Sequence, residues 1–375
     1  MSTTTIGTTT PDTTTPDTTT PDTTTPDTTT VGRNSKALGD PGHGDAFTDH
    51  LVTTRWTADT GWQPLSLGPL RELSLHPATI GLHYGQSVFE GLKAFVQQDG
   101  SVAVFRPRLN AARFARSAAR LAMPELPEEA FLSAIDLLVR ADARWLTDNP
   151  RHALYLRPVM FGSEANLMLR ESHEYTFLLM AFLAGGFFGD TVEPLTVMVG
   201  RDHARAMPGG TGDVKCAANY GPTLLAQRRA REAGCQQVVW LDPVERRWVE
   251  EMGGMNLFFV IDGEVVTPEL SGNLLPGVTR DSLLTLAVRE GYAVREGRIS
   301  IDDWREGCRT GAITETFACG TAAVVTPVGR VRDTEGDFTV GTGAEGAVTS
   351  RLRTALVDVQ HGRAPGQPGW LHRIS

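Results

Sequence analysis

Residues 209–221 read Gly209-Gly210-Thr211-Gly212-Asp213-Val214-Lys215-Cys216-Ala217-Ala218-Asn219-Tyr220-Gly221, and they carry the strongest chemical signal in this sequence. The chain has only three lysines, Lys36, Lys93 and Lys215, because nearly all its cationic positions are arginine. Arginine cannot replace lysine in forming a Schiff base through a neutral amine. A lysine between a glycine-rich turn and a run of small residues, followed closely by Tyr220, is therefore placed for imine chemistry. A solvated surface amine is the alternative, and the rest of the chain has to decide between the two.

The composition argues for a globular protein that acts on small molecules. A length of 375 residues suggests about two domains, and 41% hydrophobic residues are enough for sizeable cores. The net charge is −9 and no basic cluster stands out, so we expect neither nucleic acid nor an anionic membrane as a partner. The longest apolar run, residues 177–188, is interrupted by Gly185 and Gly186 and is too short for a membrane span of about 20 residues.

The cysteines indicate neither a metal site nor a redox motif. Cys216, Cys235, Cys308 and Cys319 are far apart and form no C-x-x-C pair, so a zinc site has no support and we expect no metal. With no signal peptide recognised, they are expected to be reduced thiols of a cytoplasmic protein.

The N-terminus is a low-complexity repeat. Thr-Thr-Thr-Pro-Asp occurs four times in tandem between Thr8 and Asp27. Proline recurs there too often for a helix or a central strand, so we predict a disordered tail over residues 1–32. A tether or a modification site is the functional alternative to a solvated appendage.

The remaining sequence predicts a mixed α+β and α/β fold with two domains. A small N-terminal α+β domain is expected over residues 33–184, a connector over 185–190, and a larger strand-rich domain over 191–375. The predicted helices are 108–122, 128–143, 220–233 and 279–290. The predicted strands are 91–96, 102–105, 154–161, 175–183, 195–199, 237–241, 248–251, 257–261, 264–267 and 312–317.

Two loops of the second half suit a phosphorylated ligand. Leu275-Pro276-Gly277-Val278-Thr279-Arg280 opens a helix, in which Gly277 lets backbone N–H groups approach a ligand and Thr279 is expected to cap the helix. Gly320-Thr321 follows a strand and offers another small-residue loop with a hydroxyl group. An ordinary helix cap and an ordinary turn are the alternatives.

An acidic pair, Glu250-Glu251, stands beside Gly253 and Gly254 at a predicted strand end. An acid that contacts a pyridine nitrogen keeps it protonated, so that the ring accepts electrons. Adjacent acids are more often solvated, which is the alternative here.

The first half offers cations and aromatic residues. Arg113 shares a helix face with Arg116 and Arg120, a pattern typical of a solvated face unless one of them reaches a phosphate. Tyr155 and Arg157 are two residues apart on a predicted strand, so their side chains point to the same side of the sheet. An arginine and a tyrosine that face one cavity suit a carboxylate.

Together these segments resemble the branched-chain amino acid aminotransferases, which are fold-type IV pyridoxal-phosphate enzymes. The resemblance runs from about Phe47 to Leu371. The segments that carry it are Phe47-Thr48-Asp49-His50, residues 83–95, Phe105-Arg106-Pro107 with Asn110 and Arg113, Tyr155-Leu156-Arg157-Pro158, residues 209–220, residues 251–258, residues 275–280 and Gly320-Thr321-Ala322.

The resemblance implies a role for each matching residue. Lys215 would form the Schiff base with pyridoxal 5'-phosphate and shuttle the proton, Tyr220 would bond the phenolic oxygen of the cofactor, and Glu251 would meet its pyridine nitrogen. The implied phosphate-binding residues are Arg113, Gly277, Val278, Thr279 and Thr321. The implied substrate-binding residues are Phe47, Tyr84, Phe89, Tyr155, Arg157, Gly254, Gly320 and Ala322, with Leu167 and Leu169 contributed by the partner subunit of a homodimer.

The implied activity is amino-group transfer between L-leucine, L-isoleucine or L-valine and 2-oxoglutarate, with the cofactor at the interface of the two domains. Met168 places bulk where the family has glycine, which leaves open a related aminotransferase specialised for another 2-oxo acid. A D-amino acid aminotransferase and an aminodeoxychorismate lyase are further alternatives. A catalytically idle scaffold protein is disfavoured because Lys215, Tyr220 and Glu251 occur together.

Overall fold

Two nine-stranded sheets make up most of the part of the chain that the structure describes. This structure is a computed structural model, and it describes residues 41–147, 149, 151–185, 187 and 192–374. Both sheets belong to one compact unit of residues 33–375. The predicted tail at 1–32 and most of the connector predicted at 185–190 lie outside the described residues, and the predicted domain boundaries stay a prediction.

The first sheet is antiparallel in every pairing and runs in the order β18-β6-β5-β7-β8-β1-β2, with β3 on β1 and β4 on β7. Its strands are β1 (Phe47–Thr57), β2 (Gly61–Trp62), β3 (Ser66–Pro69), β4 (Ser87–Phe89), β5 (Leu92–Val96), β6 (Val102–Phe105), β7 (Ala153–Gly162), β8 (Glu174–Ala184) and β18 (Leu371–Arg373). A short helix, α2 (Ile80–Tyr84), precedes β4.

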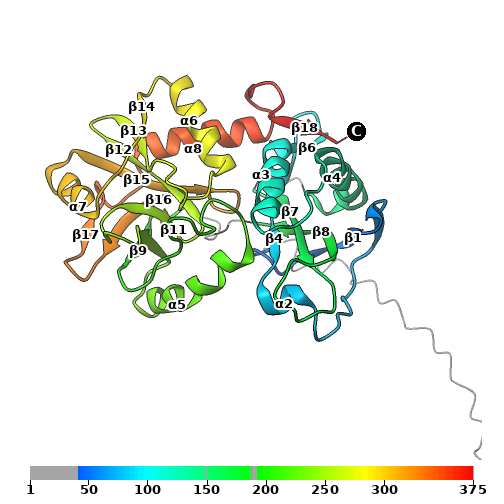
Figure 1. The fold of residues 1–375 in the computed structure, drawn as a ribbon. Helices are drawn as coiled ribbons and strands as arrows, with labels where there is room; N and C mark the ends of the chain where they lie inside the picture. The colour runs from blue at the N-terminus through cyan, green and yellow to red at the C-terminus, as the bar shows by residue number, and fades with distance from the viewer. Residues whose placement is uncertain (1–40, 148, 150, 186, 188–191, 375) are drawn as a thin grey trace, which may run out of the picture. The chain divides into compact units, whose positions relative to one another are not determined.

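Helices α3 (Pro107–Arg120) and α4 (Glu128–Asp142) pack on this sheet (Figure 1). Leu154 and Leu156 of β7 share a core with Phe114 of α3 and Ile135 of α4. Because side chains alternate along a strand, the residues between those leucines face away from the helices. The opposite face of this sheet is therefore free to line a site.

The second sheet contains a closed ring of six strands. Its order is β11-β10-β9-β16-β15-β12-β13-β14, and β11 also pairs with β12, which closes the ring through β9, β10, β11, β12, β15 and β16. Strand β9 runs parallel to both of its neighbours. The strands are β9 (Leu195–Gly200), β10 (Gln237–Leu241), β11 (Val249–Met252), β12 (Met255–Ile261), β13 (Glu264–Thr267), β14 (Val294–Glu296), β15 (Ile313–Gly320), β16 (Val324–Arg332) and β17 (Phe338–Thr339).

Helices surround this ring (Figure 1). They are α5 (Leu224–Glu232), α6 (Val278–Arg289), α7 (Ile301–Thr310) and α8 (Ala347–Gln360). One hydrophobic core contains Val197 of β9 and Phe259 of β12. A second core packs Phe258 of β12 and Phe317 of β15 against Leu283 of α6 and Leu352 of α8. None of the described helices is long and apolar enough to cross a membrane.

Most predicted elements lie within a few residues of the observed ones, and one helix start was wrong. The helix predicted from Tyr220 begins at Leu224. Two 3-10 turns, Ala217–Asn219 and Gly221–Thr223, precede it, and the second contains Pro222. Proline has no N–H group to donate to a helical hydrogen bond, so the regular helix starts after it.

Candidate active site

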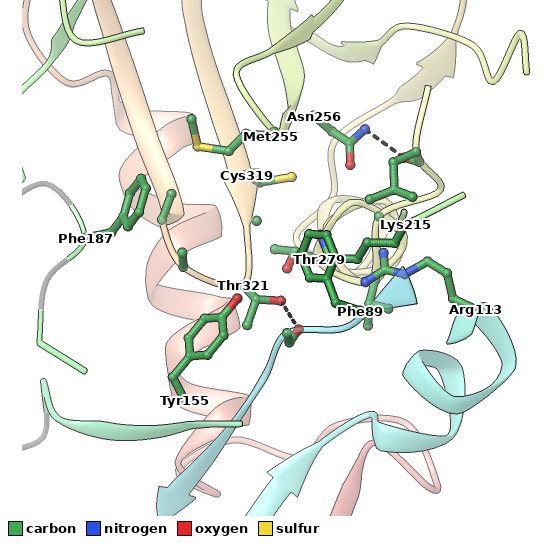
Figure 2. Close-up of a pocket in the computed structure, with 18 of the residues that line it drawn as sticks. Phe89, Arg113, Tyr155, Phe187, Lys215, Met255, Asn256, Thr279, Cys319 and Thr321 are labelled. Carbon is green, nitrogen blue, oxygen red and sulfur yellow. Dashed lines mark hydrogen bonds between the residues drawn. The ribbon is translucent and has the colours of Figure 1, made fainter. Parts of the chain in front are cut away.

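A cavity of about 230 Å³ lies between residues of the first sheet region and residues of the second, and it contains Lys215 (Figure 2). Most of the residues proposed from sequence line it. The lining residues are Phe89, Gly91, Arg113, Tyr155, Arg157, Phe187, Lys215, Tyr220, Gly254, Met255, Asn256, Leu275, Gly277, Val278, Thr279, Cys319, Gly320, Thr321, Ala322 and Ala323.

The amine of Lys215 is held inside this cavity. Its Nζ donates a hydrogen bond to the hydroxyl of Tyr220 at 2.8 Å and lies 4.7 Å from the ring centre of Phe89. The backbone is fixed as well, because the Lys215 N–H donates to Ser117 Oγ at 2.9 Å and its carbonyl accepts from the N–H of Phe89 at 3.1 Å. The amine therefore points into a defined space and is not a solvated surface group.

The glycine-rich turn before Lys215 is tied to the rest of the fold. Arg120 Nη2 donates to the carbonyls of Gly209 and Gly210, both at 3.0 Å. A Cβ on Gly212 would stand 2.3 Å from the carbonyl oxygen of Asn273, so only glycine fits there. Arg120, which the sequence placed on a solvated face, thus helps to position the lysine segment.

Glu251 lies just behind the cavity wall in a buried ion pair. It is 1% exposed, and its Oε2 lies 3.0 Å from Nε of Arg205. Its Oε1 accepts a hydrogen bond from the N–H of Leu275, a lining residue. Burial raises the pKa of Glu251, and the Arg205 guanidinium opposes that rise. Sequence reasoning missed Arg205, whose partner is distant in the chain.

Glu250 serves another region. Its Oε1 accepts a hydrogen bond from Asn273 Nδ2 at 2.7 Å, and it lines a second cavity together with Asp242 and Arg298. Burial raises the pKa of Glu250 to about 7. Of the two adjacent acids, Glu251 is the one that bonds a residue lining the Lys215 cavity.

The start of α6 suits a phosphate group. Gly277 is the N-cap and no side chain caps the helix, so the predicted capping role of Thr279 was wrong, because Thr279 is the second helical residue. Gly277, Val278 and Thr279 all line the cavity, and the first N–H groups of a helix have no intrahelical partner. A Cβ on Gly277 would stand 2.1 Å from Asn256 Oδ1, so the backbone approaches closely only because this residue is glycine.

Arg113 adds a buried cation beside this helix start. Its Nε and Nη2 bind the two carboxylate oxygens of Glu90 at 2.6 and 2.8 Å, and its Nη1 donates to the carbonyl of Pro276 at 3.1 Å. Burial alone would raise the pKa of Glu90, but the ion pair with Arg113 holds that pKa below its usual range. The guanidinium is thus fixed beside the residue that precedes Gly277. Thr321 also lines the cavity, and its hydroxyl donates to the carbonyl of Gly91 at 3.0 Å.

Aromatic side chains form the other end of the cavity. Figure 2 shows Tyr155 and Phe187 on the side opposite Lys215 and Arg113. The guanidinium carbon of Arg157 lies 5.1 Å from the ring centre of Phe89 and 5.5 Å from that of Tyr155. Tyr155 and Arg157 share one side of β7, as their spacing predicted.

Besides Glu251, four proposed residues do not line this cavity in the single chain: Phe47, Tyr84, Leu167 and Leu169. Phe47 is half exposed and contacts Phe182 edge-on. Tyr84 donates its hydroxyl hydrogen to the carbonyl of Leu167 at 2.6 Å, and Leu169 is 86% exposed. Their predicted contact with substrate, in part from the partner subunit, stays a prediction.

Comparisons with known proteins point to one family. The family model described as amino-transferase class IV matches residues 87–331. The chain is 48% identical to the branched-chain-amino-acid aminotransferase of Mycolicibacterium smegmatis over 343 residues, which cover 90% of this chain and 93% of that protein. It is 50% identical over 342 residues to the "probable branched-chain-amino-acid aminotransferase" of Streptomyces coelicolor, covering 90% of this chain and 94% of that protein.

Solved structures of branched-chain amino acid aminotransferases are also similar to this chain. The branched-chain amino acid aminotransferase of Escherichia coli matches with a TM-score of 0.72 and 28% identity, covering 88% of this chain and 100% of that one. A branched-chain amino acid aminotransferase from T.th., solved with pyridoxamine 5'-phosphate, matches with a TM-score of 0.70 and 30% identity, covering 86% of this chain and 98% of that one. The cavity, its lysine and these matches together show that the chain belongs to the class IV amino-transferase family.

Proposed function

We propose that this protein is a pyridoxal 5'-phosphate-dependent aminotransferase that moves the amino group between branched-chain L-amino acids and 2-oxoglutarate. The observation that carries the proposal is the Lys215 amine, held by Tyr220 in a cavity with a phosphate-suited helix start at one end and aromatic side chains at the other. The names of relatives that are 48–50% identical over 90% of this chain support the branched-chain substrate.

The residues around the cavity fit the proposed cofactor. Arg113 and the first N–H groups of α6 would bind its phosphate, and Lys215 would carry it covalently. The cofactor, when bound, supplies an aldehyde for the amine and a ring that accepts the electrons left when Cα loses a proton. Glu251, held as an ion pair by Arg205, would keep a proton on the ring nitrogen.

The proton chemistry falls to Lys215 and Tyr220. With the cofactor bound, the Lys215 amine would take the proton from Cα of the substrate as a general base and would later donate a proton as a general acid. The Tyr220 hydroxyl, 2.8 Å from Nζ, orients that amine. The turn Gly320-Thr321-Ala322 would hold the α-carboxylate, and the rings of Phe89 and Tyr155 would pack against an aliphatic side chain.

We also propose a homodimer. Leu82, Tyr84, Leu167, Met168 and Leu169 are between 46% and 86% exposed, and the Tyr84 and Leu167 segments are hydrogen-bonded to each other. A cluster of large exposed apolar side chains is typical of an interaction surface. Analytical ultracentrifugation should give twice the chain mass, and Leu169→Glu should shift the protein toward monomer.

A half-reaction panel tests the activity. The pyridoxal form is mixed with L-leucine, L-valine, L-phenylalanine, D-alanine or L-glutamate, and the loss of its visible absorbance is followed. We expect rapid bleaching with L-leucine and L-glutamate, and no such band in Lys215→Ala. Bleaching only with D-alanine would replace the proposal by a D-specific aminotransferase, and preference for another L-amino acid would point to the specialised aminotransferase that Met168 leaves open.

A further inference from the structure

A second cavity, of about 390 Å³, adjoins the Lys215 site and plays no part in the function proposed above. Its lining holds four carboxylic acids, a single arginine and several apolar side chains. The lining residues are Pro208, Asp242, Pro243, Val244, Glu245, Trp248, Val249, Glu250, Pro268, Glu269, Ser271, Asn273, Leu274 and Arg298. The two cavities share no lining residue, although Leu274 lines this one and Leu275 the other.

Two buried polar atoms of this lining have no hydrogen-bond partner among the described residues. Asn273 is 4% exposed, and its Nδ2 donates to Glu250 Oε1 at 2.7 Å, but its Oδ1 lacks a donor. The indole Nε1 of Trp248 lacks an acceptor. Because buried polar groups are nearly always paired, an unpaired acceptor and an unpaired donor in the lining of one cavity point to a ligand that supplies both partners.

The charged groups of the lining favour the same kind of ligand. The carboxylate of Asp242 is already bound by four backbone N–H groups. Glu250 is 6% exposed, and burial raises its pKa to about 7, so a cation beside it would favour the ionised form. The guanidinium carbon of Arg298 lies 4.0 Å from the ring centre of Trp248, and its Nη2 lies 3.4 Å from Glu245. The cavity therefore presents anionic and cationic groups together.

A zwitterion matches these groups, because an ammonium group only donates hydrogen bonds and a carboxylate only accepts them. We propose that this cavity binds a free α-amino acid with an aliphatic side chain, separately from the catalytic site. Asn273 and Glu250 bind its ammonium group. Trp248 and Arg298 bind its carboxylate, and the apolar part of the lining packs against its side chain.

This site is connected to the cofactor acid through residues 273–275. Glu250 and Glu251 are consecutive on β11, so their side chains face opposite sides of the strand. Arg205, which pairs with Glu251, also donates to the carbonyl of Asn273 at 2.8 Å, and the N–H of Leu275 donates to Glu251. A ligand on the side chain of Asn273 thus acts on the segment that holds the Glu251 ion pair. This coupling, unlike the site itself, rests on the proposed function.

The test is calorimetric titration of the borohydride-reduced holoenzyme, in which the cofactor is fixed and cannot react. Saturating 4-methylpentanoate fills the substrate pocket, and a pH of about 8 keeps Glu250, with its pKa of about 7, ionised. We expect L-leucine to bind once per chain. 3-Methylbutylamine and N-acetyl-L-leucine each lack one charged group and should bind at least about 10-fold more weakly. Equal binding of the amine would overturn the assignment to an amino acid.

Two variants locate the binding. Trp248→Phe keeps an aromatic ring and removes the donor, so the dissociation constant of L-leucine should rise about 10-fold. Glu250→Gln keeps the shape and removes the charge, and the rise should be about 10- to 100-fold. Trp62→Phe is the matched control, because Trp62 Nε1 already donates to the carbonyl of Glu125, and binding should not change. Either variant tests the site if the other fails to fold. Unchanged binding in both, or no saturable binding to wild type, would overturn the site.

The fluorescence of the reduced cofactor measures the coupling. It should change with the same midpoint as the heat of L-leucine binding, and Trp248→Phe should shift both midpoints together. Intact binding without a change in fluorescence would overturn the coupling. The half-reaction panel tests transamination separately, so its failure would refute the function while the titration still decides whether the second cavity binds an amino acid.

Discussion

Gly277→Ala probes the contact between the start of α6 and Asn256. The added methyl group would stand 2.1 Å from Asn256 Oδ1, whereas ordinary contact begins at 3.4 Å. Either the amide or the helix start must therefore move by roughly 1 Å. The backbone itself is not strained, because φ at Gly277 is −72°, which alanine adopts readily.

The expected losses of stability and cofactor affinity follow from the hydrogen bonds that the added methyl group would disturb. Asn256 is buried and donates to the carbonyl of Leu275 at 3.0 Å, and an unpaired buried group costs about 1–3 kcal/mol. Replacing glycine by alanine at a φ that alanine adopts stabilises the folded protein by about 0.4–1 kcal/mol, because the unfolded chain has less conformational entropy to lose. We expect a net loss of about 1–2 kcal/mol in the free energy of unfolding. Displaced N–H donors should weaken cofactor binding about 10- to 100-fold.

The assay is titration of the apoprotein with pyridoxal 5'-phosphate, followed by absorbance, beside urea unfolding of both forms. Gly68→Ala is the matched control, since Gly68 lies on β3 with nothing within 4 Å of its added Cβ and has no positive φ. A dissociation constant for Gly277→Ala within twofold of wild type would refute the idea that this backbone cradles the phosphate.

Two further predictions concern the Arg205–Glu251 ion pair and the N-terminal repeat. Arg205→Met should leave Glu251 without its cation and raise its pKa further, so cofactor affinity should fall at least tenfold and the absorbance of the holoenzyme should change its pH profile; unchanged spectra would contradict the role of the pair. Deleting residues 2–30 should leave turnover within about twofold of wild type, measured in a coupled assay, since the repeat has the composition of a solvated segment.

Local pattern predicted part of the elements and part of the site, whereas β1 to β4, α7 and α8 were not predicted. The alternation that places Tyr155 and Arg157 on one side of a strand is a local property, and the structure confirms it. The predicted capping role of Thr279 was wrong, because the helix begins one residue earlier, at Val278, with Gly277 as its N-cap.

Contacts between residues that are far apart in the chain could not be predicted from the sequence. Arg205 gave no local signal, because it lies in the loop after β9 while its partner Glu251 lies on β11. Lys93 was visible as a rare lysine, but its burial depends on the Ala322 loop, which is distant in the chain. Pairings of this kind depend on tertiary packing and leave no periodicity to detect.

The closed ring of six strands has a consequence for how this enzyme can change over time. Glu251, Asn256 and Cys319 stand side by side on β11, β12 and β15, so the cofactor wall belongs to a cylinder that has no unpaired edge at those positions. The facing wall of the cavity, with Tyr155 and Arg157 of β7, comes from the first sheet, which does not close into a ring among the described residues. If the proposed roles hold, substitutions on the wall from the first sheet should change the accepted side chain while the closed ring keeps its geometry.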